Sequence, residues 1–268
     1  MSTAPRKIAF VIASSAHGPL IINRFDYNTS GSTAYGVGIQ LLENGAFDQA
    51  EVDLTCRLLD LRRKYQGDGV IAIDCGANIG VHTVEWSRQM TGWGAVTAIE
   101  AQERVFYALA GNIAINNCFN ATAINAAVAA TCGSMNIPIL DYQKPASFGS
   151  LELIKLERSE QIGQPVDYSG AHSAEIKMIS LDSLDLQRCD LIKIDVEGME
   201  LSVLEGATST ISRNNPIILA EMIKTRKEDL RLKLVSFGYQ VFEVGLNFLA
   251  IHGSDPSIAH VAPRAAST

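Results

Sequence analysis

The stretch from Val70 to Thr83, VIAIDCGANIGVHT, decides which fold this sequence can adopt. An apolar run typical of a buried strand ends in Asp74, and Gly76 and Gly80 then shape a tight turn before a sequence that can begin a helix. A second apolar run ends in Glu100, about twenty residues further on. A β-α-β unit of this kind forms a nucleoside pocket, because the glycines let the backbone approach the ligand and the acid accepts hydrogen bonds from ribose hydroxyls.

The turn itself favours S-adenosylmethionine over a dinucleotide. Dinucleotide sites usually read G-x-G-x-x-G and hold a pyrophosphate at the helix N-terminus, whereas Asn78 stands where the middle glycine is expected. A carboxylate at Asp74 would repel a pyrophosphate, but it suits the ammonium and sulfonium groups of S-adenosylmethionine. For the turn taken alone, an ordinary strand-turn-helix without a ligand is the alternative.

The composition narrows the classes of protein that remain. The 268 residues are enough for one large α/β domain with additions or for two small domains, and no compositional break favours two. The formal net charge of −7 and the lack of a basic stripe argue against a nucleic-acid partner. Five scattered cysteines without a C-x-x-C pair indicate reduced thiols and a cytoplasmic protein. No apolar run reaches the length of about 18 residues that spans a membrane.

Strand-like and helix-like segments alternate from Val70 onward. This alternation predicts an α/β fold with a mainly parallel sheet and helices on both faces. The last two strand-like runs are too close together for a helical crossover, so we expect an antiparallel hairpin at the sheet edge. The predicted strands cover residues 70–74, 95–100, 122–128, 191–195, 216–222, 240–244 and 248–252, and the predicted helices cover about 81–90, 104–116, 200–213 and 227–237.

Residues 1–69 precede this alternation and are expected to form an extension that packs on the core. Lys7–Ala13 and Leu20–Arg24 are separated by turn-forming residues and predict a β-hairpin. The first of these runs is too short for a convincing signal peptide. Residues 26–48 are polar and glycine-rich and are expected to be irregular, whereas the spacing of apolar residues over Gln49–Lys64 predicts an amphipathic helix.

Residues 70–255 form the predicted main domain, which contains one long insertion. The insertion, residues 135–176, is polar and aromatic, and it leaves the sheet after the third predicted strand, next to the expected ligand. Long insertions in compact domains are often functional, so we expect this one to cover an acceptor pocket. Residues 256–268 are expected to be a flexible tail.

Carboxylates end several of the predicted strands. Asp195 ends one strand and is followed by Glu197, and Glu221 ends the next strand along the chain. Because the carboxyl ends of parallel strands meet at one edge of a sheet, we expect these acids to lie near Asp74 and Glu100. Four acids at four strand ends therefore indicate a ligand site rather than helix capping alone.

Two charged residues beside these acids have a structural alternative. Glu200 is expected to be a first-turn acid that stabilises a helix N-terminus. Lys193 lies two residues before Asp195 in the same predicted strand, so both side chains should point to the same face. An internal ion pair and a catalytic role both remain open for this lysine.

These motifs together resemble the FkbM-type methyltransferase family, and the resemblance runs from about residue 70 to residue 222 with no gap in motif order. The resemblance implies a class I, Rossmann-like methyltransferase fold that uses S-adenosylmethionine, usually to methylate a hydroxyl on a sugar or a natural product. The motifs that carry it are DCGANIG at 74–80 with His82 and Thr83, Glu100 with Gln102, the region of Asn116, NAAV at 125–128, Phe148-Gly149, LDSL at 181–184, IKIDVEGME at 192–200, LEGA at 204–207 and Glu221.

The expected cofactor site consists of the glycine turn and the ends of the neighbouring strands. Glu100 is expected to hold the two ribose hydroxyls. Small side chains at Ala126 and Ala127 would leave room for the adenine ring, with plain strand packing as the alternative. The expected cofactor-binding residues are Asp74, Gly76, Ala77, Asn78, Gly80, His82, Thr83, Glu100, Ala101, Gln102, Asn125, Ala126, Ala127 and Asp195.

Methyl transfer to an alcohol needs alignment of the reactants and removal of a proton. The candidate catalytic residues are Asp195, Glu197 and Glu221, whereas His172 is expected to lie on the surface. Paired carboxylates also suit Mg²⁺, but no third ligand is evident, so no metal site is predicted.

The acceptor is expected to contact the insertion. Tyr142, Phe148, Gly149 and Ser150 are the candidate substrate-binding residues, because aromatic and polar groups together suit a stacked, hydrogen-bonded hydroxylated substrate. Gly149 would let the backbone come close to the ligand. A solvent-exposed loop far from the site is the alternative.

Two other function classes remain open. A nicotinamide-dependent oxidoreductase uses a similar sheet, although Asp74 and the missing G-x-G count against it. A catalytically silent binding subunit would keep the fold, although the intact motif residues argue against decay. A homo-oligomer is also open, since the N-terminal extension can cover a sheet edge or pair with another subunit.

Overall fold

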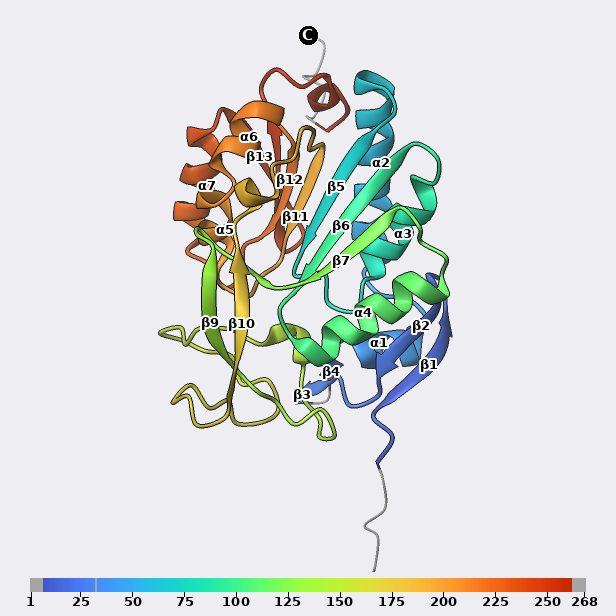
Figure 1. Cartoon of the computed structure of the whole chain (residues 1–268), viewed down its shortest axis with the longest axis vertical. Coiled ribbons are helices and arrows are strands. Elements are labelled where there is room, and N and C mark those ends of the chain that lie inside the picture. The colour runs from blue at the N-terminus through green and yellow to red at the C-terminus, as the bar shows by residue number, and fades with distance from the viewer. Residues whose placement is uncertain (1–6, 32, 262–268) are drawn as a thin grey trace, which may run out of the picture.

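The computed structural model describes residues 7–31 and 33–261, and a seven-stranded sheet lies at its centre (Figure 1). Within the sheet, β13 and β12 flank β14 and run antiparallel to it, and the other neighbours are parallel, which confirms the mainly parallel α/β sheet predicted from the alternation. The strands in spatial order are β13 (Tyr239–Val244), β14 (Asn247–His252), β12 (Ile217–Glu221), β11 (Leu191–Ile194), β5 (Val70–Cys75), β6 (Gly94–Glu100) and β7 (Ala121–Asn125).

Helices cover both faces of this sheet, because successive strand residues point to opposite sides. On β5, Ala72 packs in one core with α2 and α3, whereas Ile73 packs in another with α5, α6 and α7. Ala98 of β6 packs against α4. The helices on the first face are α2 (Gln49–Gln66), α3 (Val81–Gln89) and α4 (Glu103–Ile115), and those on the second are α5 (Glu200–Glu205), α6 (Thr208–Asn214) and α7 (Lys227–Ser236).

The N-terminal extension is more ordered than its composition predicted. The expected hairpin is present as β1 (Phe10–Ser15) and β2 (Gly18–Asn23). Residues 26–48, expected to be irregular, instead contain a second hairpin, β3 (Asn28–Ser30) and β4 (Thr33–Tyr35), and the helix α1 (Val37–Asn44). Helix α1 forms because it buries Val37 and Leu41 against the core, a tertiary contact that composition does not reveal.

The insertion begins and ends in strands. β9 (Gly133–Pro138) and β10 (Ser173–Ile179) pair antiparallel, and β10 also pairs with the short β8 (Ala127–Val128) in a separate three-stranded sheet. The prediction of one continuous strand over 122–128 was therefore wrong, because this segment forms two strands, β7 and β8. It breaks at Ala126, where the chain leaves the central sheet after β7 and joins this second sheet.

The predicted helix over 200–213 is also divided, into α5 and α6. Gly206 lies at the break, and a β-carbon added there would be 2.2 Å from the carbonyl oxygen of Ala129. A side chain at this position would collide with the neighbouring backbone, so the close approach requires glycine. The chain after β10 forms the short 3-10 helix η2 (Leu181–Leu184), against which α6 packs.

The end of the chain is partly structured. Pro256–His260, at the start of the expected tail, form the 3-10 helix η3 next to α2, and the hydroxyl of Tyr65 lies 2.8 Å from Nε2 of His260. Residues 262–268 of that tail lie outside the described residues. In the described ranges, no helix is both long and apolar enough to span a bilayer.

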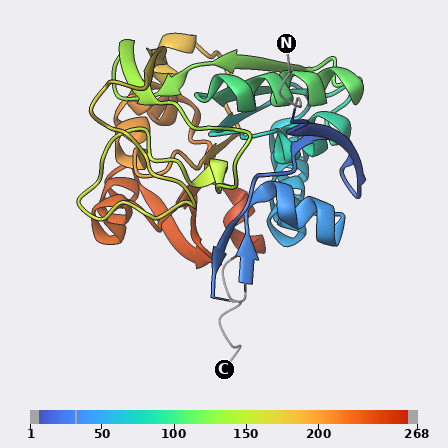
Figure 2. The same ribbon diagram turned by 90° about the horizontal axis from the view of Figure 1, so that it is seen from below.

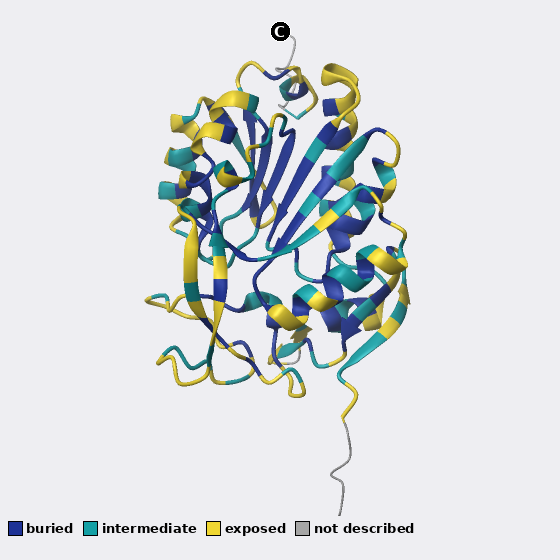
Figure 3. Cartoon of the chain, in the orientation of Figure 1, coloured by how far each residue is buried: buried dark blue, intermediate teal, exposed yellow. Residues whose placement is uncertain are grey.

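The N-terminal elements and the insertion lie side by side at the carboxyl edge of the sheet (Figure 2). Asp26 joins them, because its buried carboxylate accepts hydrogen bonds from the backbone N–H of Gly38 at 3.1 Å and of Phe148 at 2.9 Å. The inner strands of the central sheet are mostly buried, whereas the insertion loops are mostly exposed (Figure 3). These loops therefore depend on a few specific contacts for their position.

Candidate active site

The glycine turn lies at the carboxyl edge of the sheet, between β5 and α3. Gly76 has a φ of 76°, and a β-carbon added there would lie 1.8 Å from the carbonyl oxygen of Asp195, so only glycine fits beside the end of β11. Strands β5 and β11 are neighbours, and the order of the strands reverses between them. Open α/β sheets bind their ligands at such a switch point.

Glu100, at the end of β6, is tied to this turn. Its Oε2 accepts a hydrogen bond of 2.9 Å from the N–H of Asn78, and its Oε1 accepts one of 2.8 Å from the N–H of Gln102. Burial raises the pKa of Glu100 to about 7, against the lowering effect of these hydrogen bonds. The carboxylate is therefore held in one orientation at the position predicted for the ribose-binding acid.

A cavity with about 240 Å³ of water-accessible space opens beside Glu100 and runs along the carboxyl edge of the sheet. The N-terminal extension, the glycine turn, the ends of β6, β11 and β12, and the insertion all contribute to it. Of the predicted site residues, the cavity is lined by Gly76, Ala77, Asn78, Gly80, His82, Glu100, Ala101, Gln102, Ala126, Ala127, Gly149, Ser150, Asp195, Glu197 and Glu221.

Three predicted cofactor residues lie behind this lining. Asp74 is 1% exposed, and its Oδ2 accepts a hydrogen bond of 2.7 Å from the hydroxyl of Thr83, so the pair joins β5 to α3. Asn125 donates a hydrogen bond of 2.8 Å to the carbonyl of Glu100. All three side chains support the residues that form the cavity surface. Among the residues that the structure describes, none donates a hydrogen bond to the buried Oδ1 of Asp74.

The three candidate catalytic carboxylates meet where β11 and β12 end, on the opposite side of β5 from Glu100. One carboxylate oxygen from each of Asp195, Glu197 and Glu221 lies within 4.8 Å of those from the other two. Burial, with Asp195 beside it, raises the pKa of Glu197 to about 8. Burial, with Asp195 and Glu197 nearby, raises the pKa of Glu221 to about 9. Ionisation of neighbouring acids is therefore disfavoured, and Glu197 and Glu221 are stronger bases than ordinary carboxylates once they ionise.

Lys193 provides the positive charge inside the cavity. Its Nζ lies 2.8 Å from Oδ2 of Asp195, as the strand periodicity predicted, and only 5% of the residue is exposed. Burial alone would lower the pKa of this lysine, but the carboxylates of Asp195, Asp74 and Glu51 raise it above its ordinary value. The lysine therefore stays charged, and it holds Asp195 by an ion pair.

His82 lines the cavity from the first turn of α3. Its Nε2 lies 3.3 Å from Oε1 of Glu51, a residue of α2. Although burial acts in the opposite direction, His82 and Lys193 lower the pKa of Glu51 to about 2. His172 is exposed in the insertion and does not line the cavity.

A strained turn presents Glu197 to the cavity. Glu197 has a φ of 55° and Gly198 a φ of 101°, and a left-handed conformation is uncommon for glutamate. Glu200 holds this turn, because its Oε1 accepts hydrogen bonds from the N–H groups of Val196 and Gly198. Strain of this kind is concentrated at functional sites.

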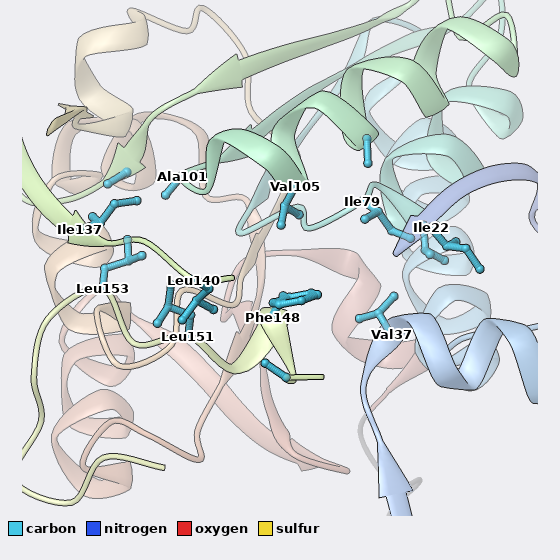
Figure 4. Packing of buried hydrophobic residues seen from close by; sticks show 14 of the residues in the cluster. Ile22, Val37, Ile79, Ala101, Val105, Ile137, Leu140, Phe148, Leu151 and Leu153 are labelled. Carbon is cyan, nitrogen blue, oxygen red and sulfur yellow. The ribbon is translucent and has the colours of Figure 1, made fainter. Parts of the chain in front are cut away.

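The predicted substrate residues divide into two pairs. Gly149 and Ser150 line the cavity, but Tyr142 and Phe148 do not. Phe148 is 2% exposed, and its ring packs in a core cluster that includes Val37 of α1 and Val105 of α4 (Figure 4). Phe148 is apolar, so its burial between the insertion and the extension outweighs contact with a polar cavity.

Tyr142 also lies behind the cavity surface. Its hydroxyl donates a hydrogen bond of 3.0 Å to the side-chain oxygen of Gln102, and the Nε2 of Gln102 donates one of 2.8 Å to the carbonyl of Phe148. These two bonds attach the insertion to Gln102, two residues after Glu100. Tyr142 and Phe148 thus position the lining residues Gly149 and Ser150.

Sequence reasoning missed the contribution of the N-terminal extension. Tyr35, Gln40, Phe47 and Asp48 line the cavity from β4, α1 and the start of α2. The Tyr-containing, glycine-rich composition of residues 26–48 was the available signal, but it does not show which core the segment packs against.

A model of the FkbM methyltransferase domain matches residues 74–241. The chain belongs to the FkbM methyltransferase family. Its sheet, with the carboxyl-edge cavity at the switch point, is therefore the class I fold of S-adenosylmethionine-dependent methyltransferases that the resemblance implied. No curated protein is close enough in sequence to count as a relative.

Several solved methyltransferases match this chain at low sequence identity. The FkbM methyltransferase of Methylobacillus flagellatus KT is 18% identical, with a TM-score of 0.47, over 69% of this chain and 43% of that one. The precorrin-6y C5,15-methyltransferase of Geobacter metallireducens GS-15 is 14% identical, with a TM-score of 0.45, over 86% and 96% of the two chains. TYW2 of M. jannaschii, in complex with AdoMet, is 11% identical, with a TM-score of 0.45, over 93% and 87%.

The chain thus spans less than half of the Methylobacillus flagellatus FkbM protein. These likenesses are too distant to transfer an acceptor or a reaction, so the family assignment rests on the domain match.

Proposed function

We propose that this FkbM-family protein transfers a methyl group from S-adenosylmethionine to a hydroxyl of a sugar, a glycan or a small natural product. The observation that carries the proposal is the layout of the cavity, which has Glu100 and two small alanines at one end and three clustered carboxylates at the other. The first end suits a nucleoside, and the second suits a group that must lose a proton.

The residues on the nucleoside side suit the cofactor in size and in charge. Ala126 and Ala127 are both 1% exposed and leave a flat surface for the adenine, and Glu100 faces the ribose position. Asp195 and the other cavity carboxylates complement the ammonium and sulfonium charges. When bound, S-adenosylmethionine supplies an electrophilic methyl group.

The carboxylate cluster is the proposed base. Glu221 and Glu197 have raised pKa values, so an ionised member accepts a proton from an alcohol more readily than an ordinary carboxylate does. Lys193 holds Asp195 in place by the ion pair of 2.8 Å. The cavity thereby meets the two requirements of this reaction, because it aligns the acceptor hydroxyl and places a base next to it.

The charge of the cavity favours an acceptor without phosphate. The described lining residues include Asp48, Asp195, Glu197 and Glu221 but no arginine, and Lys193 is already paired with Asp195. An anionic acceptor would lack a counter-ion there, whereas hydroxyl groups can donate hydrogen bonds to carboxylates. The proposed acceptor is therefore neutral at its reacting end.

Mg²⁺ fits this cluster less well than a protonated network does. The structure does bring Glu221 close enough to Asp195 and Glu197 to supply the third carboxylate that a metal site would need. However, Lys193 neutralises Asp195, and Lys224 lies 2.6 Å from Oε2 of Glu197. Two ammonium groups therefore already offset the negative charge of Asp195 and Glu197, which weakens their attraction for a divalent cation.

Titration calorimetry with S-adenosylhomocysteine and with NAD tests the proposal, together with a methyl-transfer assay on a panel of methyl glycosides and their phosphorylated counterparts. We expect binding of S-adenosylhomocysteine, no binding of NAD and transfer to a neutral glycoside. NAD binding would favour the oxidoreductase. Binding of S-adenosylhomocysteine without transfer to any acceptor would favour a silent binding subunit.

The remaining expectations concern partners and location. A cytoplasmic location, the absence of a nucleic-acid partner and the possibility of a homo-oligomer stay predictions of the sequence. So does the division into an extension over 1–69, a domain over 70–255 and a tail.

A further inference from the structure

We propose that Lys224 is a positioning residue that sets the shape of the acceptor side of the cavity, an inference that rests on the proposed methyl transfer. Lys224 follows β12, and its side chain is 10% exposed. It is not among the residues that line the cavity, so it would act through others. No sequence motif surrounds Lys224, so its local sequence does not indicate this role.

Lys224 contacts two residues of the cavity surface directly. Its Nζ donates a hydrogen bond of 2.7 Å to the carbonyl of Ser150, in the insertion. The same atom lies 2.6 Å from Oε2 of Glu197, in the strained turn after β11. One ammonium group therefore fixes the distance between the insertion and a candidate catalytic carboxylate.

A third contact extends this arrangement to the N-terminal extension. Nζ of Lys224 lies 3.0 Å from Oε2 of Glu160, and Oε1 of Glu160 accepts a hydrogen bond of 2.9 Å from the hydroxyl of Tyr35. Tyr35 lines the cavity from β4. We call Tyr35, Ser150 and Glu197 the acceptor wall, because they come from three different segments that Lys224 joins.

The segment that Lys224 holds has little structure of its own. Residues 151–172 contain no helix or strand, and many of them are exposed. A segment of this kind keeps its position only through specific contacts. The described contacts between this segment and the strand ends include the ion pairs of Lys224 with Glu160 and, at 3.6 Å, with Glu152.

The carboxylates around Lys224 explain why this position needs a positive charge. Glu152, Glu160 and Glu197 surround a single ammonium group, so its removal would leave three neighbouring carboxylates without their counter-ion. Breaking a buried ion pair is costly because the remaining charge is uncompensated. The carboxylates would then move apart, and the acceptor wall would open.

The cofactor end of the cavity is independent of this arrangement. In the described part of the chain, Gly76, Glu100 and Ala126 make no hydrogen bond or ion pair with Lys224, and the backbone N–H groups of Asn78 and Gln102 hold Glu100. Loss of Lys224 should therefore weaken acceptor binding and leave cofactor binding intact.

The test compares Lys224→Met, Lys224→Arg and the control Lys227→Met, which removes a nearby exposed lysine paired with Glu243. Hydrogen exchange with S-adenosylhomocysteine bound follows the peptides that contain Tyr35 and Ser150. We expect faster exchange at both peptides in Lys224→Met, little change in Lys224→Arg and none in the control. Unchanged exchange in Lys224→Met would overturn the proposal.

Kinetics with the methyl glycoside that the wild type methylates provide the second readout. We expect the KM for the glycoside to rise roughly ten-fold or more in Lys224→Met, with the affinity for S-adenosylhomocysteine unchanged. Because Lys224 lowers the pKa of Glu197, the rise of activity with pH should also shift to higher pH. Loss of cofactor binding in a folded Lys224→Met variant would contradict the assignment.

Glu160→Gln separates the contributions of the contacts. This substitution weakens the link to Tyr35 but leaves the ion pair with Glu197. We expect faster exchange at the Tyr35 peptide alone and a smaller rise in KM than in Lys224→Met. If Glu160→Gln changed neither the exchange at the Tyr35 peptide nor the KM, the proposed link from Lys224 to Tyr35 would be wrong. A wild type that methylates no glycoside would refute the proposed acceptor, whereas the exchange data would still decide whether Lys224 holds the wall.

Discussion

The carboxylate of Glu100 accepts a hydrogen bond of 2.9 Å from the backbone N–H of Asn78, 22 residues earlier in the chain. Asn78 belongs to the glycine turn and has a φ of 51°. The acid of the second strand and the turn after the first strand are therefore one unit, and a ligand that binds the acid also contacts the turn.

Replacement of Glu100 should weaken cofactor binding in a pH-dependent way. Glu100→Ala is expected to reduce S-adenosylhomocysteine binding by about 1.5–3 kcal/mol, the scale of hydrogen bonds to a charged group. Because the pKa of Glu100 is about 7 and ribose hydroxyls favour the ionised form, wild-type affinity should rise from about pH 6 to pH 8. Titration calorimetry at several pH values measures the affinity for S-adenosylhomocysteine of the wild type, Glu100→Ala, Glu100→Gln and the exposed control Glu103→Ala.

In that comparison, Glu100→Gln should show no such rise with pH, and Glu103→Ala should behave as the wild type does. Unchanged affinity in a folded Glu100→Ala variant would exclude the ribose-binding role.

Glu221 should make activity and stability depend on pH in opposite directions. Its pKa is raised from 4.5 to about 9 in the folded protein, so the folded state holds a proton that the unfolded state releases. Its stabilising contribution is full below about pH 4.5 and is lost as the pH rises to about 9. Proton acceptance needs the ionised form, so turnover should rise over the same window.

Denaturant unfolding and initial rates at several pH values check this prediction. Glu221→Gln should flatten the fall of stability with pH and lower turnover, whereas the exposed control Glu228→Gln should do neither. If the unfolding free energy of Glu221→Gln fell with pH as steeply as that of the wild type, another group would be responsible for the pH dependence.

A bulky residue at position 126 should block the cofactor. Ala126 is 1% exposed, lines the cavity and packs against the core below the sheet edge. Ala126→Leu would fill the space proposed for the adenine, at a cost of about 1–3 kcal/mol in stability from overpacking. We expect no detectable S-adenosylhomocysteine binding in a protein that still unfolds cooperatively. Normal binding, equal to that of the exposed control Ala114→Leu, would mean that Ala126 is only a packing residue.

Phe148→Ala should mainly lower the stability of the protein and should affect acceptor binding only indirectly. The sequence placed Phe148 in contact with the acceptor, but the ring is buried in a cluster with Val37, so its removal should cost about 3–5 kcal/mol. The lining residues Gly149 and Ser150 should then shift, which raises the KM for the acceptor while cofactor affinity stays nearly unchanged. Phe119→Ala, at a residue that is 93% exposed, is the matched control. Equal unfolding free energies of the two variants would contradict the burial argument.

Removal of divalent metal should leave methyl transfer intact. Lys193 and Lys224 already pair with Asp195 and Glu197, so the carboxylate cluster needs no cation to offset its charge. Initial rates after EDTA treatment should equal those with added Mg²⁺. A loss of activity that Mg²⁺ restores would show that Asp195, Glu197 and Glu221 hold a metal.

Local patterns in the sequence determined the central sheet and the glycine turn. The alternation of apolar and polar residues, with period two in strands and 3.6 in helices, depends on residues that are close together in the chain. The positive φ of Gly76 also depends on its local sequence. Acids at the ends of parallel strands meet at one edge in any such sheet, so Glu100, Asp195, Glu197 and Glu221 could be placed at the cavity before the structure was known.

The tertiary structure alone decided the acceptor side of the site. Which face Phe148 buries, and which core α1 packs against, depend on contacts between segments more than a hundred residues apart, such as the hydrogen bond from Phe148 to Asp26. The raised pKa values of Glu197 and Glu221 depend on burial and on neighbours that only folding brings together. Lys224 has no local motif, because its role comes from the insertion and the turn after β11, which meet at its ammonium group.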